Sequence, residues 1–241
     1  FRNISFDLFK GEILGFYGLI GSGRSELGRA LFGADSIGEG TVSLSDKPLL
    51  INSPVEAIAN GIAMVPEDRK EQALFMNLPV ISNMTISHLP ELSHLNFYIR
   101  SSLENRIIND YIRLLNIKLN EPEQPINSLS GGNQQKVILA RNLMINPRII
   151  ILDEPTHGID VGAKEEIYQL IDRLAAQGMG IIFISSEIPE IMSVSDRIAV
   201  LHEGQLAGIL KREEVTEKPP TVTATTPAGS ATAVPTSTVV A

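Results

Sequence analysis

Apolar residues along this chain follow two patterns, short continuous runs and longer segments in which they recur every three or four positions. Continuous runs predict buried strands, and helical recurrence predicts helices with one apolar face. The expected strands are residues 12–17, 61–65, 148–153, 180–185 and 197–202, and the expected helices are 25–32, 132–145 and 163–177. Strands that alternate with helices in this order predict an α/β fold with a mostly parallel core sheet.

Two further regions depart from this alternation. Residues 41–44 and 48–51 are short alternating segments on either side of a polar turn, and they predict a small antiparallel hairpin. From about residue 80 to 115 the spacing is helical, with Ser101 as the expected N-cap of a helix. We therefore expect a separate helical lobe at about residues 76–145.

The two ends of the chain differ from the rest. The sequence begins with Phe1 and runs directly into the strand-like segment 3–8, so we expect a fragment or processed piece that starts inside a folding unit. From Pro219 to Ala241 the chain contains only Pro, Thr, Val, Ala, Ser and Gly. Because such a tract cannot build a core, residues 216–241 are expected to be a disordered tail after a domain at 1–215.

The composition narrows the choice of function. A chain of 241 residues that is 43% hydrophobic can bury a substantial core. The formal charge of −8 argues against nucleic-acid binding as the main activity, since that activity usually requires a basic surface. The absence of cysteine excludes disulfides and thiolate metal sites. No stretch approaches the ~20 apolar residues that span a bilayer.

A glycine-rich loop lies between the first strand and the first helix, in the segment Gly18-Leu19-Ile20-Gly21-Ser22-Gly23-Arg24-Ser25. Glycines in this context let backbone N–H groups converge on phosphate oxygens, and the following hydroxyl can reach Mg²⁺. Arg24 stands where a phosphate loop normally has lysine. Arginine keeps the positive charge, but its side chain is longer and its planar guanidinium hydrogen-bonds differently from an ammonium group. We therefore expect that nucleotide still binds and that hydrolysis is impaired. The alternative is a glycine-rich turn without ligand.

Two acidic residues and a second glycine motif complete the candidate chemistry. Asp153 ends an apolar run and is the expected Mg²⁺ ligand, while Glu154 can orient or activate the attacking water. Ser130-Gly131-Gly132 precede a predicted helix and can form a second anion site at its N-terminus.

The sequence resembles an ATP-binding cassette domain, over roughly residues 1–215. Leu129-Ser130-Gly131-Gly132-Asn133-Gln134-Gln135-Lys136, together with Pro66-Glu67-Asp68-Arg69-Lys70, is most similar to the second cassette of bacterial sugar-importer ATPases, the group of ribose, galactose, xylose, arabinose and autoinducer-2 importers. The resemblance implies a P-loop ATPase fold with a small antiparallel β subdomain and a helical lobe. ATP and Mg²⁺ are the implied cofactors.

The resemblance also implies a role for each matching residue. The implied metal ligands are Ser25 and Asp153, and the implied catalytic residues are Asp153, Glu154 and Ser130. The Q-loop position is Glu67, the D-loop ends at Asp160, and the switch-histidine position is Ser186. The implied nucleotide contacts are Gly18, Gly21, Ser22, Gly23, Arg24, Ser25, Glu26, Glu67, Ser130, Gly131, Gly132, Asp160 and Ser186. The aromatic residue that stacks on adenine would lie upstream of Phe1.

The signature motif of the family is matched here by Leu129 to Gln134. Cassettes of this family work in face-to-face pairs, in which ATP lies between the phosphate loop of one and the signature of the other. Arg24, Glu67 and Ser186 all depart from the family pattern on this domain's own side, whereas the signature is intact. We therefore expect a C-terminal cassette half of a sugar importer that mainly completes a partner's site. The implied partners are a second cassette, membrane permease subunits and, indirectly, a periplasmic sugar-binding protein, at the cytoplasmic face of the bacterial inner membrane.

Two other functions compete with this hypothesis. One is a non-hydrolysing pairing module that binds nucleotide without turning it over. The other is a soluble cassette ATPase that acts on ribosomes or DNA, which the acidic charge balance and the form of the signature disfavour. Nucleic acid is accordingly not an expected partner.

Overall fold

The computed structural model describes residues 1–94, 98–99 and 101–215, and the predicted disordered tail lies outside these residues. A six-stranded sheet forms the centre of the molecule, with the strand order β10-β9-β1-β8-β7-β4. Every pairing in it is parallel except that of β10 with β9. The strands are β1 (Ile13–Gly18), β4 (Ile62–Val65), β7 (Ile149–Asp153), β8 (Gly180–Ile184), β9 (Arg197–His202) and β10 (Gln205–Lys211). The mostly parallel core is confirmed, and β10 is an additional strand.

Helices cover both faces of this sheet, which explains why its strands are continuous apolar runs. On one face, Leu14 and Phe16 of β1 belong to a cluster with Leu27 of α1 (Arg24–Leu31). On the other face, Ile13 and Phe183 belong to a larger cluster that includes residues of three helices packed against the sheet. These helices are α6 (Gly131–Met144), α7 (Val161–Ala176) and α8 (Ile188–Val194).

Parallel pairing brings the carboxyl ends of the strands to one edge of the sheet. Asp153 at the end of β7 is in register with Ile184 at the end of β8, and Phe16 of β1 is in register with the same Ile184. The segments that follow β1, β7 and β8 therefore start beside one another, where ligands of open α/β sheets commonly bind.

The small hairpin is present as β2 (Val42–Leu44) and β3 (Lys47–Leu49). Its two turn residues, Ser45 and Asp46, both have positive φ, as a two-residue hairpin turn of this hand requires. A short helix that the sequence pattern did not predict follows it, α2 (Pro54–Ala59), which begins after the N-cap Ser53.

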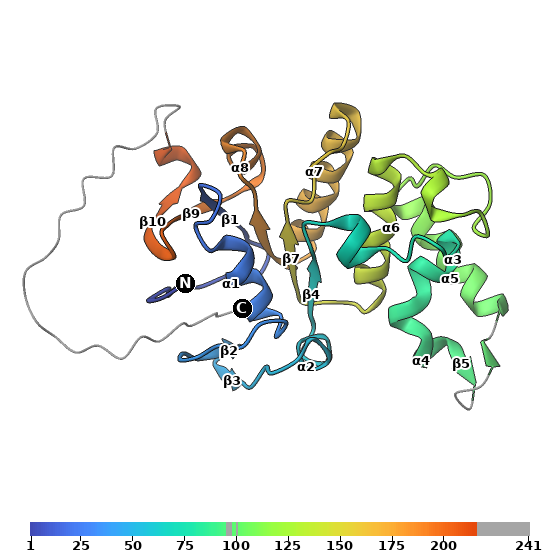
Figure 1. Cartoon of the computed structure of the whole chain (residues 1–241), viewed down its shortest axis with the longest axis horizontal. Helices are drawn as coiled ribbons and strands as arrows, with labels where there is room; N and C mark the ends of the chain where they lie inside the picture. Colours follow the sequence, from blue (N-terminus) through green and yellow to red (C-terminus); the bar gives the residue numbers. More distant parts are fainter. Residues whose placement is uncertain (95–97, 100, 216–241) are drawn as a thin grey trace, which may run out of the picture.

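The predicted lobe lies at one end of the molecule (Figure 1). It contains α3 (Val80–Thr85), a 3-10 turn (Ile86–His88), α4 (Leu89–Leu92), α5 (Ser101–Leu114) and α6. A short hairpin that was not predicted, β5 (Ser93–His94) with β6 (Tyr98–Ile99), interrupts the helices. Ser101 is the first residue of α5 and not its N-cap, so that prediction is wrong by one position.

The strand-like segment at residues 3–8 is not a strand. Ile4, Phe6 and Leu8 are buried and alternate with exposed residues, as the period-2 pattern indicated. However, both edges of β1 are already paired, with β8 and with β9. The apolar alternation therefore reflects packing into the core without a place in the sheet.

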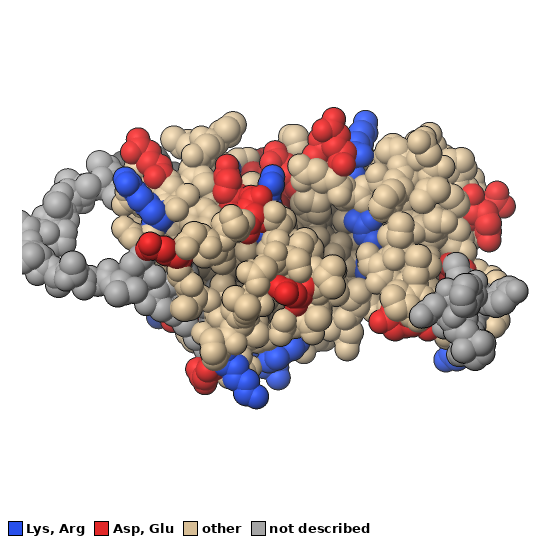
Figure 2. All heavy atoms as spheres, turned by 60° about the horizontal axis from the view of Figure 1, so that its bottom comes forward, with Lys and Arg blue, Asp and Glu red and all other residues tan. Residues whose placement is uncertain are grey.

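Two surface properties bear on function. Within the described ranges, no helix combines the length and the apolar character needed to cross a bilayer. On the face in Figure 2, acidic and basic side chains are interspersed among neutral ones, and neither sign forms a continuous patch there.

Candidate functional site

The segment Gly18–Ser25 comprises the last residue of β1, the loop at residues 19–23 and the first two residues of α1, and the loop leaves the start of the helix open. Gly21 and Gly23 have φ of 79° and 92°, which glycine adopts at little cost. Gly23 is the N-cap of α1 and supplies no side-chain hydrogen bond, so the first N–H groups of the helix are open to donate hydrogen bonds to an anion. A Cβ on Gly18 would lie 2.5 Å from the Leu201 carbonyl oxygen, so only glycine fits there.

Arg24 is buried and crosses the site toward two neighbouring strand ends. Its Nη1 donates a hydrogen bond to the carbonyl oxygen of Ser185 at 2.5 Å. Its Nη2 lies 3.7 Å from Oε1 of Glu154, with which it forms an ion pair. The positive charge expected from the phosphate loop is therefore present, but it is held between a carbonyl group and the carboxylate that was expected to activate water.

Asp153 occupies the end of β7 and is only 2% exposed. Ser25 Oγ donates to its Oδ1 at 3.1 Å. Burial is the largest effect on this carboxyl and raises its pKa to about 6. The Ser25 hydrogen bond and Arg24 lower the pKa, while Glu67 and Glu154 raise it. Glu67, Glu154 and Arg24 thus all lie within electrostatic reach of the Asp153 carboxyl, to which Ser25 is hydrogen-bonded.

This donor set suits Mg²⁺, because hydroxyl and carboxylate oxygens are the ligands that this hard cation prefers. Ser25 and Asp153 already face each other through a hydrogen bond that a bound cation would replace. Within the described part of the chain, no group of three or more His, Asp or Glu side chains forms a metal cage. An Mg²⁺ ion here would thus depend on nucleotide phosphates and water for its remaining ligands, as is usual for this cation.

Glu154 adopts an unusual backbone conformation, with φ of 45°. Its N–H donates to the Ile184 carbonyl oxygen at 2.9 Å, which ties the turn after β7 to β8. Left-handed φ in a non-glycine residue costs of order 1–3 kcal/mol and is found most often at functional sites. The turn therefore fixes the direction of the Glu154 side chain at an energetic cost.

The signature segment begins α6. Ser130 is the N-cap of this helix and is exposed, and its Oγ accepts a hydrogen bond from Asn133 Nδ2 at 2.9 Å. Its hydroxyl does not cap the backbone of α6, so the helix start remains open to an anion. Gly132 is tightly packed, because a Cβ there would lie 2.5 Å from Ala163 Cβ of α7.

Arg69 connects several of these segments and was not singled out by the sequence reasoning. Its Nη1 and Nη2 donate to the carbonyl oxygens of His157 and Gly158, at 2.7 and 3.3 Å. Burial lowers its pKa, against the opposing effect of Asp68. A Cβ on Gly131 would come within 3.3 Å of Arg69 Nη2, so the guanidinium lies against the signature. Only its place inside Pro66–Lys70 offered a sequence signal.

A hollow of about 450 Å³ opens beside Arg69, and its lining is polar and charged. The lining residues are Glu67, Asp68, Arg69, Lys70, His157 and Gly158. His157 is exposed and contributes only its backbone carbonyl to the Arg69 contact among the described residues.

Other predicted residues are placed as follows. Asp160 is the N-cap of α7, and its Oδ1 accepts from the N–H of Ala163 at 3.0 Å, so its carboxylate already has a partner within the chain. Glu26 and Ser186 are exposed, and Ser22 is buried. Among the described residues, no hydrogen bond joins Ser130 to the phosphate loop, and its hydroxyl is bonded to Asn133.

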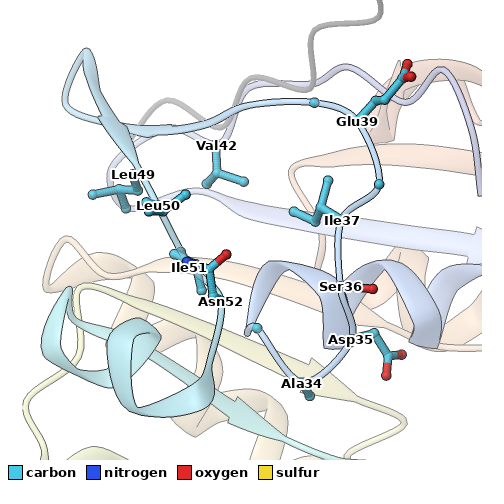
Figure 3. Close-up of a pocket in the computed structure, with 13 residues that line it drawn as sticks. Ala34, Asp35, Ser36, Ile37, Glu39, Val42, Leu49, Leu50, Ile51 and Asn52 are labelled. Atoms are coloured by element: carbon cyan, nitrogen blue, oxygen red, sulfur yellow. The ribbon is translucent and has the colours of Figure 1, made fainter.

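A second hollow, of about 430 Å³, lies between the loop after α1 and the segment that follows β3 (Figure 3). Ile37, Val42 and Leu49 give it an apolar wall, and Asp35 and Glu39 stand nearer its rim. None of the motif residues lines it.

The parallel sheet and the open loop after β1 define the class of P-loop nucleotide-binding proteins. A sequence profile of the ABC transporter family matches residues 1–157, and the chain belongs to this family.

The chain is similar to two ribose import ATP-binding proteins named RbsA. The protein from Geobacillus kaustophilus is 50% identical over 213 residues, which are 88% of this chain and 43% of that protein. The protein from Caldanaerobacter subterraneus subsp. tengcongensis is 50% identical over 218 residues, which are 90% of this chain and 44% of that protein. The chain thus spans less than half the length of these relatives.

Solved structures show the same fold. A dimeric bacterial ABC transporter cassette, MJ0796, matches with a TM-score of 0.73 and 23% identity, over 86% of this chain and 88% of that one. The ADP conformation of the cassette MJ1267 matches with a TM-score of 0.72 and 25% identity, over 86% and 83%.

The close contact at Gly132 makes a direct prediction about packing. Gly132→Ala is expected to lower the free energy of unfolding by about 1–3 kcal/mol, because the new methyl group would overlap Ala163 and push α7 from α6. Urea unfolding measures this change. Gly162→Ala is the matched control, since its Cβ would meet no atom closer than 3.5 Å. Equal destabilisation by both substitutions would show that packing at Gly132 is not the cause.

Proposed function

We propose that this chain is the C-terminal ATP-binding cassette of a bacterial sugar importer, which couples ATP binding and hydrolysis to carbohydrate uptake. The 50% identity to ribose import ATP-binding proteins supports this assignment and makes ribose the first sugar to test. Its partners are a second cassette and membrane permease subunits, with a periplasmic sugar-binding protein as an indirect partner. The cassette then lies at the cytoplasmic face of the inner membrane.

On its own side, the cassette binds ATP with Mg²⁺ and turns it over poorly. The loop from Gly18 to Gly23 holds the phosphates through backbone N–H groups, and Ser25 and Asp153 hold the cation, which neutralises phosphate charge when bound. Glu154 would orient the attacking water, but its carboxylate is paired with Arg24.

Two further departures point in the same direction. Ser186 offers no imidazole at the switch position, and Glu67 brings a carboxylate where the family has glutamine. Both residues are exposed at the same side of the fold as the phosphate loop. The two substitutions and the Arg24 contacts all weaken the same half-site, which is the phosphate-loop side of the ATP site that this cassette contributes.

The observation that carries the proposal is the contrast between this half-site and the signature. Ser130 is exposed at the open start of the 14-residue helix α6, and within the described part of the chain its hydroxyl is hydrogen-bonded to Asn133 alone. Two open N–H groups and a hydroxyl at a positive helix end suit a phosphate on another molecule. We infer that Ser130, Gly131 and Gly132 complete the ATP site of the partner cassette.

The test uses the purified chain with a fluorescent ATP analogue and a phosphate-release assay. We expect Mg²⁺-dependent nucleotide binding without measurable turnover by the chain alone, and turnover when an intact partner cassette is added. The second candidate, a non-hydrolysing pairing module, predicts binding but no turnover in either case. Turnover by the chain alone at the rate of the pair would overturn the asymmetric proposal.

A further inference from the structure

Glu190, on α8, is a buried carboxylate that lies outside every motif of the nucleotide site. It is 5% exposed. Thr156 Oγ1 lies 2.8 Å from both of its carboxylate oxygens, Ser185 Oγ donates to Oε2 at 2.9 Å, and Lys164 Nζ donates to Oε1 at 2.6 Å. The nearby Tyr168 hydroxyl also helps to lower the pKa of this carboxyl, against the opposing effect of burial. A buried charge with this many partners is fully satisfied, and it fixes the positions of the groups that satisfy it.

These partners come from segments that frame the nucleotide site. Thr156 is two residues beyond Glu154, in the turn after β7. Ser185 directly follows β8, and Lys164 lies in the first turn of α7, whose N-cap is Asp160. One carboxylate therefore joins the turn after β7, the turn after β8 and the start of α7.

Ser185 connects this carboxylate to the phosphate loop. Its Oγ donates to Glu190 and accepts a hydrogen bond from the N–H of Glu187 at 3.0 Å, which fixes the turn. Its carbonyl oxygen accepts the hydrogen bond of Arg24 Nη1 at 2.5 Å. The side chain of Ser185 is thus held by Glu190, while its backbone holds Arg24.

We propose that Glu190 is a positioning residue that holds Arg24 away from bound nucleotide. Glu190 fixes the position of Ser185, whose carbonyl oxygen binds the Arg24 guanidinium. Through Thr156 it also fixes the turn that contains Glu154, the ion-pair partner of Arg24. A phosphate group bound at the start of α1 must compete with the Ser185 carbonyl and with Glu154 for Arg24. This inference rests on the proposed nucleotide binding and adds a restraint on its affinity.

The experiment is a double-mutant cycle on the full chain, read as the Kd for a fluorescent ATP analogue with Mg²⁺. Glu190→Gln is expected to tighten binding about three- to tenfold when Arg24 is present, because the anchor of the guanidinium is weakened. In an Arg24→Met background, the same substitution is expected to change the Kd less than about 1.5-fold. Such non-additivity distinguishes a positioning role from a contribution to folding alone.

Two further variants support the cycle. Glu166→Gln is the matched control, because Glu166 of α7 pairs with Lys136 of α6 and forms no hydrogen bond with Ser185 among the described residues; its Kd is expected to match the wild type. Ser185→Ala removes only the hydroxyl that joins Glu190 to the anchor, and it carries the test if Glu190→Gln does not fold. We expect it to tighten binding in the same direction and to lose that effect with Arg24→Met.

Equal effects of Glu190→Gln in both Arg24 backgrounds would overturn the positioning role, as would weaker binding when Arg24 is present. Both outcomes leave nucleotide binding itself intact. Absence of binding by the wild-type chain would instead overturn the proposed function, and this inference with it.

Discussion

Ser130→Glu in this chain is expected to reduce ATP turnover by the assembled pair of cassettes by about 100-fold or more. Arg24→Met is expected to reduce it less than about threefold, since the half-site that contains Arg24 contributes little turnover. The physical reason is the negative charge that glutamate adds and the position of residue 130 at a helix N-terminus. Ser130 lies at the open, positive start of α6, where a carboxylate would repel the γ-phosphate of the partner's nucleotide.

Single-turnover hydrolysis by the assembled pair measures both effects. Ser102→Glu is the control, because Ser102 is an exposed serine in the first turn of α5, the other 14-residue helix of the lobe. This control adds the same charge at a helix start outside the signature, and we expect it to leave turnover unchanged. Similar losses from Ser130→Glu and Arg24→Met would mean that both half-sites turn over ATP.

The core sheet was predictable because its strands are buried on both faces. Residues 149–152 and 180–184 can only be continuous apolar runs when helices cover both sides, and such runs are visible in sequence. The strand β10 was not predictable in this way. It lies at the sheet edge, each of its residues is exposed or half-buried, and several of them are polar or glycine.

The motifs point to the carboxyl edge of the sheet as the candidate site, but the contacts among their residues could not be predicted without the three-dimensional structure. The substitution at Arg24 was visible in the sequence, whereas its hydrogen bond to Ser185 joins residues 161 positions apart. Glu190 was missed because a glutamate between proline and isoleucine has no motif. Its position on the buried side of α8, between Ile188 and Ile191, was the available signal, since a charge there must be paired.

The buried carboxylate of Asp153 sets function against stability. At pH 8, without Mg²⁺ or nucleotide, Asp153→Asn is expected to raise the free energy of unfolding by about 1–3 kcal/mol. Burial, the largest effect, raises the pKa of Asp153 to about 6, above its ordinary value of 3.8. The folded state therefore holds this proton more tightly than the unfolded chain. The contribution of Asp153 to stability is greatest below pH 4 and is lost as the pH rises through about 6.

Asparagine keeps the oxygen that accepts the Ser25 hydrogen bond and removes the charge, so the same substitution is expected to weaken Mg²⁺–ATP binding by about 100-fold. Urea unfolding at pH 4, 6 and 8 and the Kd of a fluorescent ATP analogue provide the two measurements. Asp172→Asn, which neutralises an exposed carboxylate of α7, is expected to change neither. If Asp153→Asn were less stable than the wild type at pH 8, the carboxylate would support the empty fold. Burial of the charged Asp153 carboxylate would then not destabilise the nucleotide-free protein, and nucleotide binding would have no such destabilisation to offset.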